Sequence, residues 1–424
     1  MLLGDGMDRC SLAHEILSQL PLAQQTAAWG TLGTIKPYLG FDVESDVQHL
    51  TEAIVGNGAD HGAILDVLTN RTSAQRQQIT KVFQALTKQD LLKSMEAALS
   101  GNLERVIVGL LKPPAQYDAH ELRAAMQGMG TDEDALTEIL STRSNQQLRE
   151  ILAFYQQDFK ADPEKDIALE TSGWFKEILL VLAKGKRERD TGIIDYALIQ
   201  QDAEALADPG ASSEGAGERT WISIFTQRSP EHLSRVFSQY RKSHGLEVEE
   251  TICKRFRGDG QMAMLALASA CRNTPRYFAE KLHYAMKGPG TDDKVLIRVL
   301  VSRSETDLLS IRSEFKKCHG KSLYSCLQCG DERRLPGSPA SLVQGGRPIG
   351  QLPASEKPAE PIGLQKTVGN SAPGREGSMS PPSGIGFIPF ITFTHFIMET
   401  AMSRTQQGAS TLQPGYVIAS PSLE

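Results

Sequence analysis

The sequence predicts an all-α protein made of four copies of one helical unit, followed by a disordered tail. Two observations favour this fold class. A glycine-containing segment that closes on an arginine occurs four times, and the closing arginines lie 72, 85 and 75 residues apart. Apolar residues near these segments recur every three or four positions, as on one face of a helix, and do not alternate as in a β-strand. A motif that returns at a nearly constant period is typical of a repeat array.

Each copy consists of a glycine loop followed by a helix-like run. The fourth copy, MKGPGTDDKVLIRVLVSRS at 286–304, closely matches MQGMGTDEDALTEILSTRS at 126–144. A fainter copy is IVGNGADHGAILDVLTNRT at 54–72, and the most altered is ADPGASSEGAGERTWISIFTQRS at 207–229. The glycines are not followed by Gly-Lys-Ser/Thr or preceded by a strand-like run, which excludes a nucleotide-type phosphate loop.

The second unit shows the helical pattern most clearly. Leu136, Ile139 and Leu140 recur at helical spacing after the loop, and Leu148 and Ile151 continue the pattern further along the unit. At 1.5 Å per residue, a period of this length accommodates about five short helices.

Helix start signals follow the closing arginine of every copy. In three units a Ser or Thr is followed three residues later by Gln or Asp, which is the pattern of a capping box. In the third unit the Ser is followed by a proline at the first helical position, where a missing N–H is harmless. We therefore expect a new helix after each arginine, capped by Thr72 with Gln75, Ser144 with Gln147, Ser229 with Pro230, and Ser304 with Asp307.

Composition narrows the function classes. The chain has 424 residues and a formal net charge of −6, so it is weakly acidic, which argues against nucleic acid as its main partner. Its six cysteines lack the spacing of a disulfide framework, and the first residues carry acids where a signal peptide needs an apolar core. We expect a cytoplasmic protein with free thiols, whose contact with membranes is local and peripheral.

The motifs resemble those of the annexin family, whose repeats of about 70 residues carry K-G-x-G-T-D after the first helix and S-R-S/T near the end of the second. The resemblance covers 41–328 and all four units. Within the family the sequence looks most similar to a member whose calcium loops are degenerate. It implies a curved, all-helical disc whose calcium loops lie on the convex face, where calcium bridges the protein to anionic phospholipid. The implied segments are an N-terminal segment 1–40, repeats at 41–115, 116–188 and 189–273, a truncated fourth repeat at 274–330, and a tail at 331–424.

The resemblance also implies a set of calcium ligands. Calcium takes six to eight oxygens, and glycines let a loop turn several backbone carbonyls inward. In annexins the one carboxylate of the site lies 38 positions after the Asp of the loop motif. In repeat two that position is Glu170, so the expected site consists of the carbonyls of Met126, Gly128 and Gly130 with the Glu170 carboxylate. The loop could instead be a relic, retained only as a turn.

The other three repeats lack this acid. The corresponding positions are Ala98 in repeat one, Arg255 in repeat three and Gly330 in repeat four, where Asp331 lies one residue out of register. In repeat three Lys254, Arg255 and Arg257 form a basic cluster. Such a cluster is usually a solvated face. If it faces a membrane, it could attract anionic head groups in place of calcium.

Neither catalysis nor an ordered tail is expected. The histidines show no metal spacing or nucleophile partner, CLQC at 326–329 is a lone CxxC, and we predict that the protein is not an enzyme. The tail is rich in Pro, Ser and Gly without helical periodicity, although 385–398 is apolar. We expect the last two helices of the fourth repeat to be missing, which would leave the apolar faces that include Leu296, Leu308 and Phe315 partly uncovered.

Two functions are consistent with these features. The first is a peripheral phospholipid-binding protein with weak, single-site or absent calcium dependence, whose partner is an anionic membrane surface such as one containing phosphatidylserine. The alternative is a helical protein-protein interaction scaffold that has lost membrane binding. The oligomeric state, including a homo-oligomer, and the identity of protein partners are left open.

Overall fold

The computed structural model describes residues 33–55, 58–128, 130–208, 215–287 and 291–332, and every regular element within them is an α-helix. The predicted all-α class is thus confirmed. The predicted disorder of the tail concerns residues that, beyond Glu332, lie outside this described part, as does the apolar segment 385–398.

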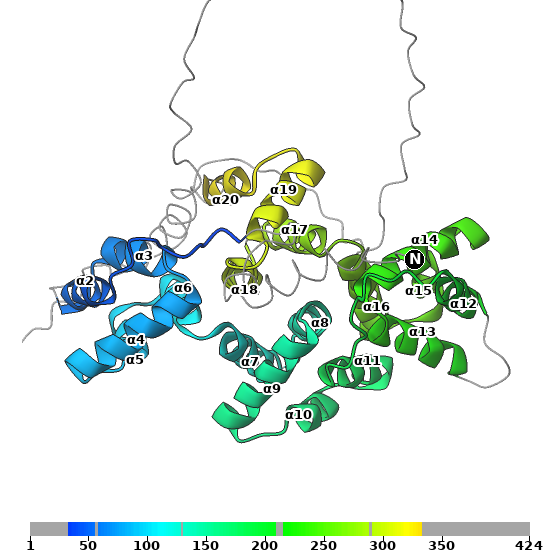
Figure 1. Cartoon of the computed structure of the whole chain (residues 1–424), viewed down its shortest axis with the longest axis horizontal. Coiled ribbons are helices and arrows are strands. Elements are labelled where there is room, and N and C mark those ends of the chain that lie inside the picture. The colour runs from blue at the N-terminus through cyan, green and yellow to red at the C-terminus, as the bar shows by residue number, and fades with distance from the viewer. Residues whose placement is uncertain (1–32, 56–57, 129, 209–214, 288–290, 333–424) are drawn as a thin grey trace, which may run out of the picture.

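The helices fall into four consecutive groups that match the four predicted repeats (Figure 1). Repeat one contains α2 (Val43–Val55), α3 (His61–Thr69), α4 (Ser73–Thr87), α5 (Leu91–Ala98) and α6 (Gly101–Leu111). Repeat two contains α7 (Pro114–Ala125), α8 (Glu133–Thr142), α9 (Asn145–Phe159), α10 (Pro163–Glu170) and α11 (Gly173–Ala183). Repeat three contains α12 (Tyr196–Ala207), α13 (Ala216–Gln227), α14 (Pro230–His244), α15 (Val248–Arg255) and α16 (Gly258–Arg272). Repeat four contains α17 (Thr274–Ala285), α18 (Asp293–Arg303), α19 (Leu308–His319) and α20 (Leu323–Glu332).

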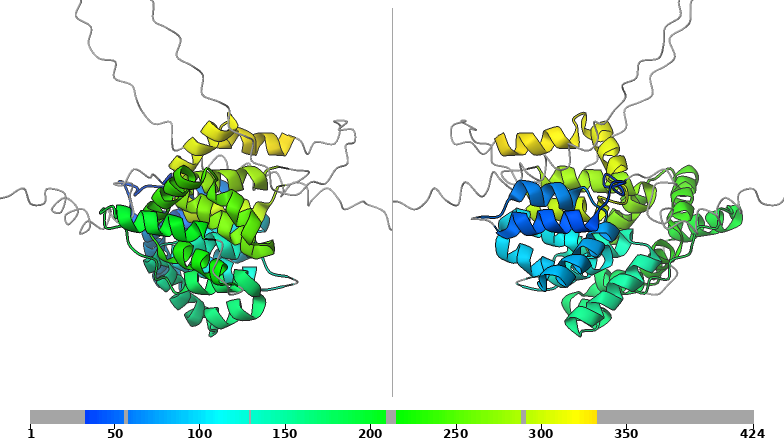
Figure 2. Two further views of the ribbon diagram at one scale, coloured as in Figure 1. Left: turned by 90° about the vertical axis from the view of Figure 1, so that its right-hand side faces the viewer. Right: turned by 60° about the vertical axis from the view of Figure 1, so that its left-hand side comes forward.

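Helix α20 corrects one expectation, because only the fifth helix of repeat four is absent from the described residues and the fourth is present. Its start is capped by Ser322, whose Oγ accepts a hydrogen bond of 3.0 Å from the backbone N of Ser325. Leu323 is 4% exposed and joins the core that repeats one and four share, and Tyr324 and Leu327 pack against the same core. Residues 323, 324 and 327 lie on one helical face, a spacing that was already present in the sequence. Figure 2 shows α19 and α20, in yellow, at one edge of the molecule.

The apolar side chains of repeat four are also better covered than the sequence suggested. Leu296, Leu308 and Phe315 are all buried. They belong to a cluster that extends into repeat one, so the neighbouring repeat supplies much of the cover.

The predicted helix caps form in three repeats and fail in the fourth. Thr72 with Gln75 and Ser144 with Gln147 make complete capping boxes, and Ser229 caps α14 above Pro230. In repeat four Ser304 is the C-cap residue of α18, with φ of −56° and ψ of −38°, and α19 begins only at Leu308 without a side-chain cap. The expected cap by Ser304 and Asp307 is therefore wrong.

The failure follows from the partner of the closing arginine. In the first three repeats this arginine pairs with an aspartate 25 or 26 residues earlier in the first helix, with N–O distances of 2.7–2.8 Å for Arg71–Asp46, Arg143–Asp118 and Arg228–Asp202. In repeat four the matching position is Phe278, and the Arg303 guanidinium lies 4.6 Å from the centre of its ring. Arg303 pairs instead with Asp307 at 2.6 Å, so this carboxylate bonds the guanidinium and does not cap α19.

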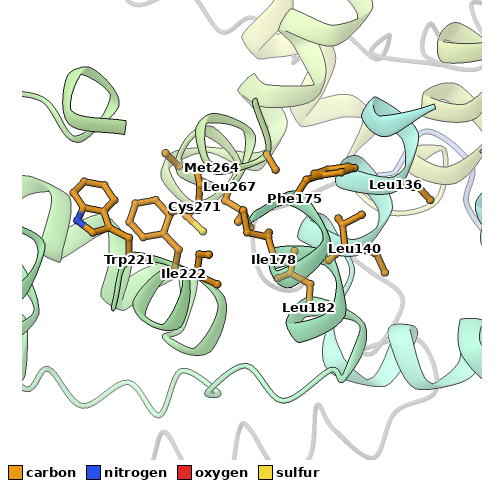
Figure 3. Close-up of a cluster of buried hydrophobic side chains, with 14 of the residues drawn as sticks. Leu136, Leu140, Phe175, Ile178, Leu182, Trp221, Ile222, Met264, Leu267 and Cys271 are labelled. Atoms are coloured by element: carbon orange, nitrogen blue, oxygen red, sulfur yellow. The ribbon is translucent and has the colours of Figure 1, made fainter. Parts of the chain in front are cut away.

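Two large hydrophobic cores divide the described helices into pairs of repeats. One core joins repeats two and three, and the other joins repeats one and four and includes Ala270 of α16 in repeat three. Figure 3 shows part of the first core, where Ile178 of repeat two lies between Leu140 of the same repeat and Ile222 and Leu267 of repeat three. A smaller cluster connects the two pairs through Ile35, Leu110, Tyr117, Ile297 and Val301.

Candidate functional site

The repeat-two loop has the geometry that its glycines allow. It follows α7 at Met126 and ends at Asp132, whose backbone N donates to the carbonyl of Ala125 at 2.8 Å and closes the loop. Gly128 and Gly130 have φ of 112° and 101°, a region that residues with a side chain rarely adopt. A side chain at either position would strain the turn. Met129, between them, lies outside the described residues.

The structure brings this loop next to the predicted acid. Glu170 is the last residue of α10 and is exposed. Thr131, in the loop, donates from Oγ1 to the backbone carbonyl of Glu170 at 3.3 Å. The four predicted ligand residues of repeat two therefore belong to two segments in direct contact. Glu170 lies 40 positions after Gly130, the last of the other three in the chain.

The residue types fit a calcium ion. The part of the chain that the structure describes has no cluster of three or more His, Cys, Asp or Glu side chains that could hold a metal. A metal site in repeat two would therefore be built from backbone carbonyls and a single carboxylate. A flexible set of oxygen donors of this kind suits calcium better than zinc or another metal that prefers nitrogen and sulfur.

Repeats one and four keep the loop frame and lack the acid. Asp60 and Asp292 cap α3 and α18 as Asp132 caps α8, and their backbone N–H groups close the loops through hydrogen bonds of 2.8 Å. In repeat one Ala98 ends α5, at the position of Glu170. In repeat four α20 continues through Gly330 to Glu332 instead of turning there. The loops of repeats one and four thus keep their backbone hydrogen bond and helix cap without a carboxylate at the position of Glu170.

Repeat three has a different arrangement. Its second helix, α13, has Gly215 at the N-cap position, where the other repeats have an aspartate, and therefore no side-chain cap. Arg255 ends α15, as Glu170 ends α10, and its Nη2 donates to the backbone carbonyl of Asp208. Arg257 donates from Nη1 to three carbonyls at the end of α15, those of Cys253, Lys254 and Phe256, at 2.6–3.1 Å, and Lys254 is exposed.

Trp174 packs between the turn that follows Glu170 in repeat two and the starts of α13 and α16 in repeat three. It lies four residues after Glu170, and its ring is so close to Gly215 that a Cβ there would come within 3.0 Å of it. A Cβ on Gly260 would likewise come within 3.1 Å of Trp174. The guanidinium of Arg219 lies 5.9 Å from the centre of the Trp174 ring. The Glu170 turn and the first turns of α13 and α16 are therefore neighbours.

A buried ionic network lies close to the repeat-two loop, and the sequence reasoning missed it. Glu138 of α8 is 0% exposed and accepts from Lys281 of α17 at 2.9 Å and from Arg298 of α18 at 3.0 Å. Burial by itself would raise the pKa of Glu138, but the charges of Lys281 and Arg298 lower it to about 2. Arg298 also lies 3.8 Å from Asp132, the aspartate that closes the calcium-type loop.

Comparison with known proteins agrees with this architecture. The family model "Annexin" matches residues 45–110, 117–182, 201–267 and 277–331, which together make up more than half of the chain. The chain belongs to the annexin family. Annexins are calcium-dependent phospholipid-binding proteins that attach to membranes peripherally and generally have no enzymatic activity.

Individual annexins are similar over most of their length. Annexin A9 from Homo sapiens is 54% identical over 318 residues, which cover 75% of this chain and 91% of the relative, and annexin A9 from Mus musculus is 56% identical over the same length. The structure of annexin III superposes with a TM-score of 0.69 at 40% identity, over 72% of this chain and 95% of that one. Chicken annexin V superposes with a TM-score of 0.65 at 43% identity, over 71% of this chain and 95% of that one.

Proposed function

We propose that this annexin binds anionic phospholipid membranes peripherally in the cytoplasm and that its calcium response depends on repeat two alone. The observation that supports this most strongly is the contact between the repeat-two loop and the Glu170 segment. Among the described residues, only repeat two combines a glycine loop with an acid at this position. None of the described helices is long and apolar enough to cross a bilayer.

A single-site response should be weak. Three neutral carbonyls and one carboxylate leave the coordination shell of calcium incomplete, and a lipid phosphate would complete it. Calcium and membrane would then raise each other's affinity for the protein by the same factor. A relative of 30% identity, annexin (Sm)1, is known in a calcium-bound structure with a TM-score of 0.64, which supports a calcium loop in this fold.

Glu170→Gln tests the assignment, because it keeps the shape of the side chain and removes its charge. We expect calcium-stimulated binding to phosphatidylserine vesicles to weaken by about tenfold or more, since even indirect partners of metal ligands contribute about 10–100-fold to affinity. Co-sedimentation with vesicles, with calcium and with chelator, measures the effect. Glu164→Gln, which removes an exposed charge from the same helix, is the matched control and should leave binding unchanged.

Two results would contradict the calcium site. Undiminished stimulation in Glu170→Gln would place the calcium elsewhere. Absence of any calcium response in the unmodified protein would mean that the loop is a relic. The caps made by Asp60 and Asp292 show that such loops can shape the fold without an acid partner.

The alternative function is an interaction scaffold that does not bind membranes. It would predict no vesicle binding with calcium or with chelator. The basic cluster of Lys254, Arg255 and Arg257 favours the membrane function, because exposed cations at this place can attract anionic head groups.

A further inference from the structure

Repeat three has an arginine side chain at the position that is equivalent to the calcium position of repeat two. The equivalence rests on two pairs of positions. Asp208 follows the last residue of α12 as Met126 follows the last residue of α7. Arg255 is the last residue of α15 as Glu170 is the last residue of α10. The bond from Arg255 Nη2 to the Asp208 carbonyl therefore joins the two positions that would share calcium in repeat two.

The Arg255 guanidinium is held by a second contact. It lies 5.8 Å from the centre of the Trp221 ring, which is completely buried. Trp221 is itself fixed, because its Nε1 donates to the carbonyl of Leu206 at 3.1 Å. A carbonyl on one side and an aromatic face on the other thus orient a side chain that is still partly exposed to solvent.

A guanidinium can perform the bridging role of calcium toward phosphate. Calcium in an annexin loop attracts a carbonyl oxygen of the protein and a phosphate oxygen of the lipid. Arginine has five N–H donors in a planar fork, keeps its charge at all physiological pH values and binds phosphate through two parallel hydrogen bonds. The Asp208 carbonyl uses one of these donors.

We propose that Arg255 takes the place of calcium in repeat three and binds the phosphate of an anionic phospholipid without calcium. This inference rests on the proposed membrane function and adds a second, calcium-independent contact to it. The packing of Trp174 against Gly215 and Gly260 places this contact beside the Glu170 turn, so one membrane surface can meet both.

The structure separates Arg255 from the other two cations of the basic cluster. The Arg257 guanidinium holds the carbonyls at the end of α15, which makes it a helix cap. Lys254 is exposed and contributes charge without a planar fork. A general electrostatic attraction would use all three cations alike, whereas a phosphate site at the calcium position depends on Arg255.

The test compares Arg255→Gln with Lys254→Gln in the full chain, by binding to phosphatidylserine vesicles in chelator. One basic residue near an anionic surface is worth about fivefold in affinity through charge alone, and this is the loss expected for Lys254→Gln. Arg255→Gln should lose about tenfold or more, because it also removes charge-assisted hydrogen bonds to phosphate. Arg255→Lys keeps the charge and removes only the planar fork, so its loss should be smaller than that of Arg255→Gln. Unchanged circular dichroism and melting temperature would show that each variant folds.

The outcomes distinguish the inference from the proposed function. Equal losses in Arg255→Gln and Lys254→Gln would overturn the phosphate site and leave a diffuse charge effect. Binding of the unmodified protein in calcium but not in chelator would overturn the site while the proposed function stands. Failure to bind vesicles in either condition would overturn both. Inorganic phosphate should not replace the vesicles, and Arg255-dependent binding of free phosphate with similar affinity would overturn the assignment to lipid.

Discussion

Glu138→Gln should lower the free energy of unfolding by about 3–5 kcal/mol, the usual effect of removing one partner of a buried ionic pair. The substitution preserves the size of the side chain but removes the one carboxylate, among the described residues, that both Lys281 and Arg298 contact at 3.0 Å or less. Of the ion-pair partners of Arg298 in the described part of the chain, Asp132 and Asp134 would remain, at 3.8 and 3.7 Å, and Lys281 would keep Asp134 at 2.6 Å. Chemical denaturation followed by circular dichroism measures the change.

A surface charge on the next helix provides the control. Glu150 of α9 is exposed, so Glu150→Gln should change stability by less than about 0.5 kcal/mol. Similar effects of Glu138→Gln and Glu150→Gln would show that the network contributes no more than a surface pair.

The same network predicts an acid-sensitive contribution to stability. The pKa of Glu138 is about 2 in the folded protein, below its ordinary value of 4.5. A carboxyl whose pKa is lowered by folding stabilises the protein above its unfolded pKa, and this contribution is lost as the pH falls. The difference in stability between the unmodified protein and Glu138→Gln should therefore be constant near neutral pH and shrink between about pH 4.5 and pH 2. A difference that stays constant across this range would contradict the assigned charge state.

Most of the fold could be predicted from the sequence because its signals are local. The repeated loop, the helical spacing and the caps at Thr72 and Ser144 each depend on residues a few positions apart, and these predictions are confirmed. The cap at Ser304 failed because it depends on a distant residue. Phe278 replaces the aspartate that would have paired with Arg303, and Asp307 takes over as the partner of this arginine.

The buried network also depends on residues that are far apart in the sequence, and for this reason it was not predicted. Glu138 and Arg298 are 160 positions apart, and nothing local pairs them. The signal that was available is that each is a charged residue inside an apolar helical face, in DALTEIL and VLIRVLV. Charged residues are almost never fully buried unless paired, so these two positions could have been matched as partners.

The candidate site was predicted in part. Counting positions along the chain found Glu170, and the structure places it beside its loop. The same count found Arg255 but not its bond to the Asp208 carbonyl, because the sequence does not specify where a long side chain points. Two of the three cations that the sequence grouped together, Arg255 and Arg257, bond different carbonyls.

Phe315→Ala should lower the free energy of unfolding by about 3–5 kcal/mol, as is typical for a phenylalanine removed from a core. The side chain is 0% exposed in α19 and belongs to the core that repeats one and four share. Because the two repeats are stabilised by one cluster, the effect should not be confined to repeat four. Hydrogen exchange should accelerate in α3, around Ile64 and Leu65, as well as in α17 to α19.

A matched change in the other core decides whether the two pairs of repeats open separately. Phe237 of α14 is equally buried and belongs to the core of repeats two and three. Phe237→Ala should therefore accelerate exchange around Ile178 and Leu179 of α11 and leave α3 largely protected, the reverse of the pattern expected for Phe315→Ala. The smaller cluster, Ala270 of α16 and the Glu138 network join the two pairs, and each is limited in extent compared with the cores. If either substitution accelerated exchange equally in α3 and α11, these connections would be strong enough to make the four repeats one cooperative unit, and the division into two cores would have no counterpart in stability.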